Sequence, residues 1–156
     1  MHLGIEYKIA ELFTLGFDKL VVTPWTSIEN AHRTFMGHDV FTTLVYVKAL
    51  LDEQCCIVTA EPPEMQHSCS CRDRVGCAED WWAIWWNGMG RLLLDARNPQ
   101  PYKDAFDRFQ FLEFGRVSED CKKVMLTQVM LINVPAVHER NFISSIRTRL
   151  IKKLVN

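Results

Sequence analysis

The sequence predicts an all-α protein, an irregular bundle of about six or seven helices with one long Cys-rich loop. Apolar residues recur at helical spacing through most of the chain, residues that typically begin or end helices separate these stretches, and one central segment has no periodicity. The 156 residues, 48% of them hydrophobic, can bury ~70% of the surface that the unfolded chain exposes. We therefore expect a domain that needs no disulfide or metal ion to form its core.

Three helical stretches are predicted in the first 54 residues. Residues 5–21 have apolar side chains at the spacing of an amphipathic helix, with a break near Gly16. Residues 26–37 form a short helix, because Thr26 and Glu29 have the spacing of a capping box and Gly37 can end it. Residues 40–54 are apolar over too wide a stripe for a surface helix. We expect that helix to be central.

Helical periodicity is absent from residues 55–80, which contain paired prolines and many small polar residues. We interpret this segment as a loop, and loops of this length in compact domains often carry function. The chain is thereby divided into residues 1–54, the Cys/His/Pro-rich loop 55–80, and residues 81–156. We expect the first and third parts to form one compact unit.

Three more helices follow the tryptophan-rich segment. Pro101 can occupy the first turn of a helix that ends at Gly115. Ser118 can cap the next helix, whose first turn is acidic. Apolar spacing predicts a last helix from about residue 136 to residue 154.

Four tryptophans occupy six positions in the segment DWWAIWWNGMGR, residues 80–91. At ~100° per residue, Trp81 and Trp85 share one helix face and Trp82 and Trp86 share the adjoining face. Helical periodicity explains these positions without a ligand, so we favour a buried core over an aromatic binding box. The predicted core residues of this helix are Trp81, Trp82, Trp85, Trp86, Met89, Leu92 and Leu93.

The segment DWWAIWWNGMGRLLLDARNPQPYKDAFDRFQFLEFGRVSEDCKKVML, residues 80–126, resembles the region carboxy-terminal to the BTB/POZ domain in fungal, mainly basidiomycete, BTB proteins. The segment LGIEYKIAELFTLGFDKLV, residues 3–21, is similar to the helix pair that ends a BTB fold. The resemblance covers nearly the whole chain. It implies an adaptor role in protein–protein interaction and no catalytic residue, and it leads us to expect that the BTB core itself is missing.

The predicted loop gathers four residues that can bind a metal ion, namely His67, Cys69, Cys71 and Cys77. Zinc accepts sets of thiolate and imidazole ligands, and a closed site would order a segment that has little hydrophobic reason to fold. The spacing lacks the strong Cys-x-x-Cys pair. The alternative is a loop of free thiols with one histidine.

Charge and motifs argue against several classes of function. The net charge of −1 and a pI near 6.5 disfavour a sequence-wide attraction to nucleic acid or anionic membranes. No stretch approaches the ~20 apolar residues of a membrane span, and the first residues lack the pattern of a secretory signal. We expect an intracellular protein, in the cytoplasm or the nucleus, with reduced cysteines.

The sequence contains neither a glycine-rich phosphate loop nor a His-Glu-x-x-His motif. We therefore expect no catalytic residue, no bound cofactor and no enzyme activity. The most consistent function is a non-catalytic module that binds other proteins. The alternatives are a zinc-stabilised binding module and nucleic-acid binding through the basic last helix, which carries Arg140, Arg147, Arg149, Lys152 and Lys153.

Overall fold

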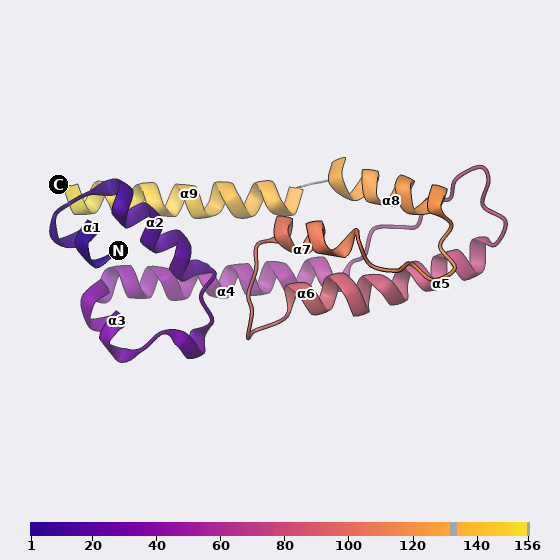
Figure 1. Ribbon diagram of the computed structural model, residues 1–156. Coiled ribbons are helices and arrows are strands. Elements are labelled where there is room, and N and C mark those ends of the chain that lie inside the picture. The colour runs from indigo at the N-terminus through magenta and orange to yellow at the C-terminus, as the bar shows by residue number, and fades with distance from the viewer. Residues whose placement is uncertain (132–133, 156) are drawn as a thin grey trace. The chain divides into compact units, whose positions relative to one another are not determined.

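The computed structural model describes residues 1–131 and 134–155, and it confirms the predicted all-α class (Figure 1). Within these ranges there is no strand, and none of the helices has the length and hydropathy needed to span a membrane. The α-helices are α1 (His2–Glu6), α2 (Ala10–Val21), α3 (Asn30–Met36), α4 (His38–Ala60), α5 (Arg74–Ile84), α6 (Arg91–Leu93), α7 (Tyr102–Phe109), α8 (Glu119–Leu131) and α9 (Val134–Val155). A 3₁₀ turn (Trp25–Ser27) and a π-helical turn (Trp85–Gly90) complete the described elements.

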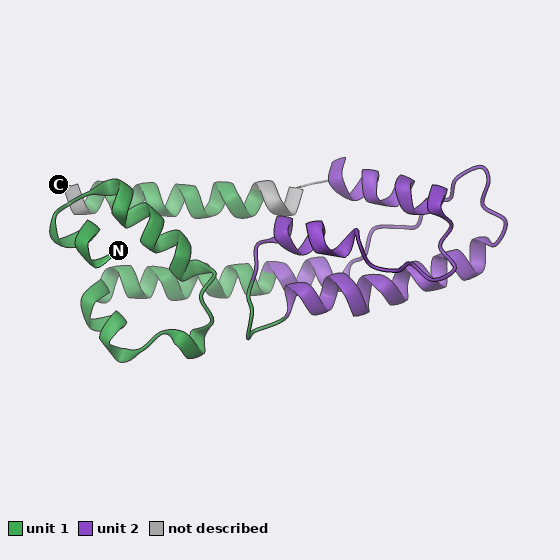
Figure 2. Cartoon of the chain, viewed as in Figure 1, with its two compact units in different colours: residues 1–53, 95–99, 137–156 green, residues 54–94, 100–136 purple. Residues whose placement is uncertain are grey.

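The chain divides into two compact units, shown in green and purple in Figure 2. Unit 1 comprises Met1–Glu53, Asp95–Pro99 and Val137–Asn156, and unit 2 comprises Gln54–Leu94 and Gln100–Ala136. This differs from the expectation that residues 1–54 and 81–156 form one compact unit. The physical reason is that the buried apolar side chains gather in two separate clusters, one in each unit.

The core of unit 1 is formed mainly by α2, α4 and α9. Phe13 and Phe17 of α2 are fully buried and their rings stack at 5.9 Å. The chain reverses between α1 and α2, where Lys8 has a φ angle of +54°. The predicted break near Gly16 is therefore wrong, because that glycine lies inside α2. The buried side chains of this core are Phe13, Phe17, Val21, Met36, Val40, Leu44, Val47, Ile146 and Leu150.

Two polar features fix the helix ends in unit 1. The buried Lys48 donates hydrogen bonds of 2.7 Å from Nζ to the carbonyls of Val21 and Thr23, just where α2 ends. The capping box at α3 pairs Glu29 with His32. The predicted box of Thr26 and Glu29 is wrong because the helix begins four residues after Thr26.

Unit 2 is built around an aromatic core. Trp81 and Trp85 are almost completely buried, with ring centroids 5.7 Å apart. Phe109 packs edge-on against both tryptophans and lies 5.2 Å from Phe114. The buried residues of this core are Cys77, Trp81, Trp85, Met89, Leu93, Tyr102, Ala105, Phe106, Phe109, Phe114, Val117, Cys121, Met125 and Val129.

Two of the predicted core tryptophans lie at the surface. Trp82 is 48% exposed and Trp86 is 47% exposed, so their assignment to the core is wrong. Trp81, Trp85 and Met89 follow one another at four-residue spacing and form a single buried stripe. Trp82 and Trp86 lie about 100° further around the helix. Leu93 is buried as predicted, whereas Leu92 is only partly buried at the edge of the core.

The irregular segment is shorter than predicted. α4 continues to Ala60 and α5 begins at Arg74, so only residues 61–73 connect them. Pro62 and Pro63 follow the end of α4, which is consistent with their inability to continue a helix. Asp73 caps α5, because its Oδ1 atom accepts a 2.9 Å hydrogen bond from the backbone N–H of Gly76.

Candidate metal centre and apolar pocket

The buried tryptophans bond the last turns of α4 and the start of the 61–73 segment through their indole N–H groups. Trp85 Nε1 donates to the carbonyl of Val58 at 3.3 Å, and Trp81 Nε1 donates to the carbonyl of Pro63 at 2.9 Å. The helical partner of the Val58 carbonyl would be the N–H of residue 62, and Pro62 has none. Trp85 therefore satisfies a backbone acceptor that the proline leaves open.

The middle of the 61–73 segment is bound to α8. The backbone N–H of Gln66 lies 3.0 Å from Met125 Sδ, and that of Ser68 lies 3.3 Å from Cys121 Sγ. Ser70 Oγ donates a 2.6 Å hydrogen bond to Asp120 Oδ2. These contacts place the loop residues on either side of Ser68 against the first turns of α8.

Four potential metal ligands meet at this position. One ligand atom from each of His67, Cys71, Cys77 and Cys121 lies within 4.8 Å of the other three. His67 Nδ1 and Cys71 Sγ are 3.5 Å apart. Cys77 and Cys121 are buried, whereas His67 and Cys71 are partly buried. The group thus combines two ligands from the 61–73 segment with one from α5 and one from α8.

The two helical cysteines both lie in the first turn of their helix. Cys77 is the fourth residue of α5 and Cys121 is the third residue of α8. The backbone N–H of Cys121 donates to Ser118 Oγ at 3.3 Å, which fixes the start of α8. Amino-terminal helix turns favour negative charge, so both positions suit thiolates.

The three cysteines differ in their acidity. Burial raises the pKa of Cys121, but hydrogen bonds from Ser118 and Ser68 more than offset this effect and lower that pKa to about 6. Burial raises the pKa of Cys77 to about 12 and also raises the pKa of Cys71. Cys121 is therefore the most acidic thiol of the three, and a bound cation would favour the thiolate form of all of them.

Three of the four predicted metal ligands come together in the structure. These are His67, Cys71 and Cys77, and the fourth member of the group is Cys121. The structure does not bring Cys69 into the group, because its side chain is exposed and lies apart from the other four. Sequence spacing missed Cys121 because α8 reaches the loop only in the folded chain. The sequence did contain one signal for Cys121. This cysteine lies in the first turn of the helix predicted after Ser118, where a thiolate is favoured.

The chain before α8 is held against α5 by a charged contact. The backbone N–H of Arg116 donates to Asp80 Oδ2 at 2.6 Å, and the Arg116 guanidinium bonds both Asp80 and Glu79. These hydrogen bonds lower the pKa of Asp80. The preceding Gly115 has a φ angle of +54°, which favours glycine, and a Cβ atom at this position would clash with the Asp80 carboxylate. This contact fixes the start of α8, and with it Cys121.

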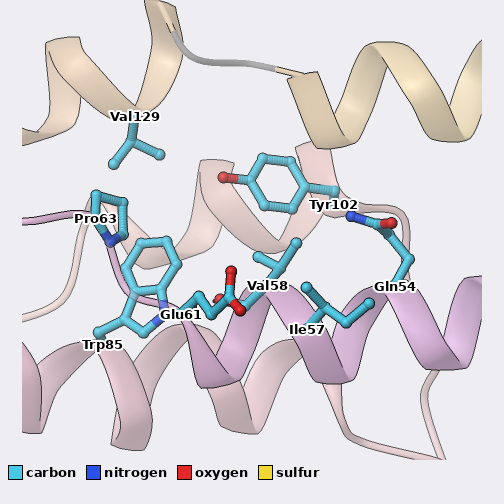
Figure 3. Close-up of a pocket in the computed structure, with 8 residues that line it drawn as sticks. All are labelled: Gln54, Ile57, Val58, Glu61, Pro63, Trp85, Tyr102 and Val129. Carbon is cyan, nitrogen blue, oxygen red and sulfur yellow. Dashed lines mark hydrogen bonds between the residues drawn. The ribbon is translucent and has the colours of Figure 1, made fainter.

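A separate pocket of about 220 Å³ lies in unit 2 (Figure 3). One face of α4 forms one side of it, and Trp85, Tyr102 and Val129 are the buried side chains in its lining. Burial raises the pKa of Tyr102 to about 12, so the phenol is neutral at physiological pH. The lining residues are Gln54, Ile57, Val58, Glu61, Pro63, Trp85, Tyr102 and Val129.

Comparisons with known proteins give no assignment. No protein-family model matches the chain, and neither the curated proteins nor the solved structures contain a match.

Proposed function

We propose that this chain is a non-catalytic protein-interaction module, and that unit 2 binds a basic amphipathic segment of a partner protein. The observation that carries the proposal is the pocket beside α4. Its volume of about 220 Å³ exceeds that of an engineered cavity of ~150 Å³ that holds benzene. The pocket therefore has room for one leucine or phenylalanine side chain.

The lining of the pocket suits an apolar anchor. Ile57 is 47% exposed, and Trp85, Tyr102 and Val129 present buried apolar surfaces to the same space. Gln54, Ile57, Val58 and Glu61 have the spacing of a single helix face. Protein interfaces concentrate their binding energy where one large side chain enters such a pocket.

Charge near the pocket favours a basic partner. The carboxylate of Glu61 belongs to the lining, and Glu64 follows just after α4. Residues 54–71 contain no lysine or arginine. Complementary charge steers association and selects among partners, so a partner segment with lysine or arginine beside its apolar anchor fits best.

The described side chains that line the pocket also support a non-catalytic role. They include no cysteine, serine, histidine or lysine, and the Tyr102 phenol does not ionise near neutral pH. The resemblance to the region that follows BTB domains, which implies an adaptor, favours the same class of function. Nucleic-acid binding by the last helix has less support, because Arg147 pairs with Asp18 at 2.5 Å.

A peptide-binding assay tests the proposal. The probe is a fluorescein-labelled amphipathic peptide of leucine and lysine, compared with a leucine–glutamate peptide and a lysine–glutamine peptide of the same length. We expect only the leucine–lysine peptide to raise its fluorescence anisotropy in the presence of the full chain. Ile57→Asp should weaken this binding at least ~10-fold, because losing an interface anchor costs ~2 kcal/mol or more.

Leu94→Asp is the matched control, because Leu94 is 46% exposed and does not line the pocket. This variant should bind the leucine–lysine peptide like the unaltered protein. Equal loss of binding in the two variants, or equal binding of the three peptides, would contradict the proposal.

A further inference from the structure

We propose that His67, Cys71, Cys77 and Cys121 bind one structural zinc ion. This site is separate from the pocket, and the proposal does not rest on the peptide-binding function. It rests on the nature of the four ligands, on their separation, and on the elements that they connect.

The four ligands match the preference of zinc. Three thiolate sulfurs and one imidazole nitrogen are a common ligand set of structural zinc sites, which are almost always tetrahedral. Soft sulfur ligands disfavour magnesium and calcium, which take oxygen ligands. Because the protein supplies all four ligands, no coordination position is left for water or a substrate, and the site is structural rather than catalytic.

The separation of the four ligand atoms is close to what zinc requires. With metal–ligand distances of ~2.0–2.3 Å, neighbouring ligand atoms in a tetrahedron lie about 3.3–3.8 Å apart. The four atoms already lie within 4.8 Å of one another, so no pair has to close by more than about 1.5 Å. His67 and Cys71 lie outside helices, so this closure does not require a turn of α5 or α8 to unwind.

The surroundings of Cys121 are those of a metal-bound thiolate. The backbone N–H of Ser68 points to its sulfur at 3.3 Å, and the Ser68 hydroxyl lies 3.4 Å from the same atom. Hydrogen bonds to ligand atoms are a regular feature of metal sites, where they fix the orientation of the ligand. Ser68 immediately follows His67, so one loop turn supplies a ligand and a hydrogen bond to another ligand.

The site would connect three separate parts of unit 2. His67 and Cys71 lie in the 61–73 segment, Cys77 in α5 and Cys121 in α8. Within the 61–73 segment, Met65 and Cys71 are the hydrophobic side chains that pack against the core. Hydrophobic burial therefore contributes little to the order of this segment, and metal binding would supply the missing free energy.

Zinc analysis of the purified full chain is the first test. The protein is prepared with a phosphine reductant and without added metal or chelator. Its zinc content is then measured by inductively coupled plasma mass spectrometry. We expect about one zinc ion per chain, and a cobalt-substituted sample should show the absorption bands of tetrahedral cobalt–thiolate coordination. A reduced protein that holds no zinc even after incubation with zinc chloride would overturn the proposal.

Two cysteine variants assign the ligands. Cys121→Ser should weaken zinc binding about 100-fold or more, because it removes a direct ligand, whose loss costs at least as much as that of an outer-shell partner. Cys69→Ser removes a neighbouring exposed thiol outside the group and should keep the zinc content of the unaltered chain. Competition with a chromophoric chelator measures both affinities.

A third variant keeps the test decisive if the buried Cys121→Ser variant does not fold. His67→Gln changes a partly buried ligand outside the helices, and circular dichroism checks that its helices remain. It should lose zinc affinity as strongly as Cys121→Ser. If Cys69→Ser lost as much zinc as His67→Gln, the assignment of the four ligands would be wrong.

Discussion

Trp85 and Trp86 are neighbours in the π-helical turn, and both were predicted to lie in the core. In the structure their exposed fractions differ widely. Trp85 is 1% exposed and Trp86 is 47% exposed. Replacing each by alanine removes the same side chain from a buried and from a half-exposed position. We expect Trp85→Ala to reduce the stability of unit 2 severely and Trp86→Ala to reduce it only slightly.

The magnitude follows from the contacts of each ring. Removing a buried tryptophan typically costs ~3–5 kcal/mol. Trp85→Ala also leaves the Val58 carbonyl without its indole donor, and an unsatisfied buried polar group costs ~1–3 kcal/mol. The sum of about 4–8 kcal/mol is a large share of a typical stability of ~5–15 kcal/mol. Trp86 buries about half of its surface, so its loss costs about 1 kcal/mol and opens no closed cavity.

Urea denaturation followed by far-ultraviolet circular dichroism measures the difference. We expect the midpoint of the unit 2 transition to fall sharply, or the transition to vanish, for Trp85→Ala and to change little for Trp86→Ala. Trp85→Phe should lie between them, because it keeps an aromatic ring but not the indole donor. Equal destabilisation by the two alanine variants would refute the one-sided packing of this helix.

Three further outcomes are expected. Removing zinc with a strong chelator should increase hydrogen exchange and proteolysis in residues 61–73 while the far-ultraviolet circular dichroism stays nearly constant, and loss of all helical signal would contradict this expectation. Acidification should also release the metal, because protons compete with it for the thiolates. Asp80→Asn should lower stability at pH 7, because the carboxylate with its lowered pKa stabilises the fold above its ordinary pKa. This difference should shrink as the pH falls through the lowered pKa, and a difference independent of pH would count against the ion pair with Arg116. Lys48→Met should lower the free energy of unfolding by ~1–3 kcal/mol, since two carbonyls at the end of α2 lose their donor, whereas the exposed Lys123→Met should have little effect in the same urea titration.

The fold class was predictable because helical periodicity is a local property of the sequence. The ends of the irregular segment were not, because Cys55 to Ala60 lacks a clear apolar stripe although α4 runs through it. Likewise, helical spacing grouped Trp82 and Trp86 with the core, but only the packing of unit 2 shows which adjoining face remains exposed.

The candidate metal site was predictable only where its residues are close in sequence. His67, Cys71 and Cys77 could be found from their local density in a segment without apolar periodicity. Cys121 could not be found this way, because it is distant in sequence. Its position beside the other three ligands depends on the contact between Arg116 and Asp80 and on the packing of α8. Cys69 was included by proximity in sequence, and the fold leaves it exposed.

X-ray absorption spectroscopy at the zinc edge tests the proposed centre most directly. The purified, reduced chain should show about three sulfur atoms at ~2.3 Å and one nitrogen atom at ~2.0–2.1 Å from the metal. His67→Gln should lose the imidazole scattering, and Cys69→Ser should leave the spectrum unchanged. A metal shell made only of oxygen and nitrogen atoms would contradict the site formed by His67, Cys71, Cys77 and Cys121.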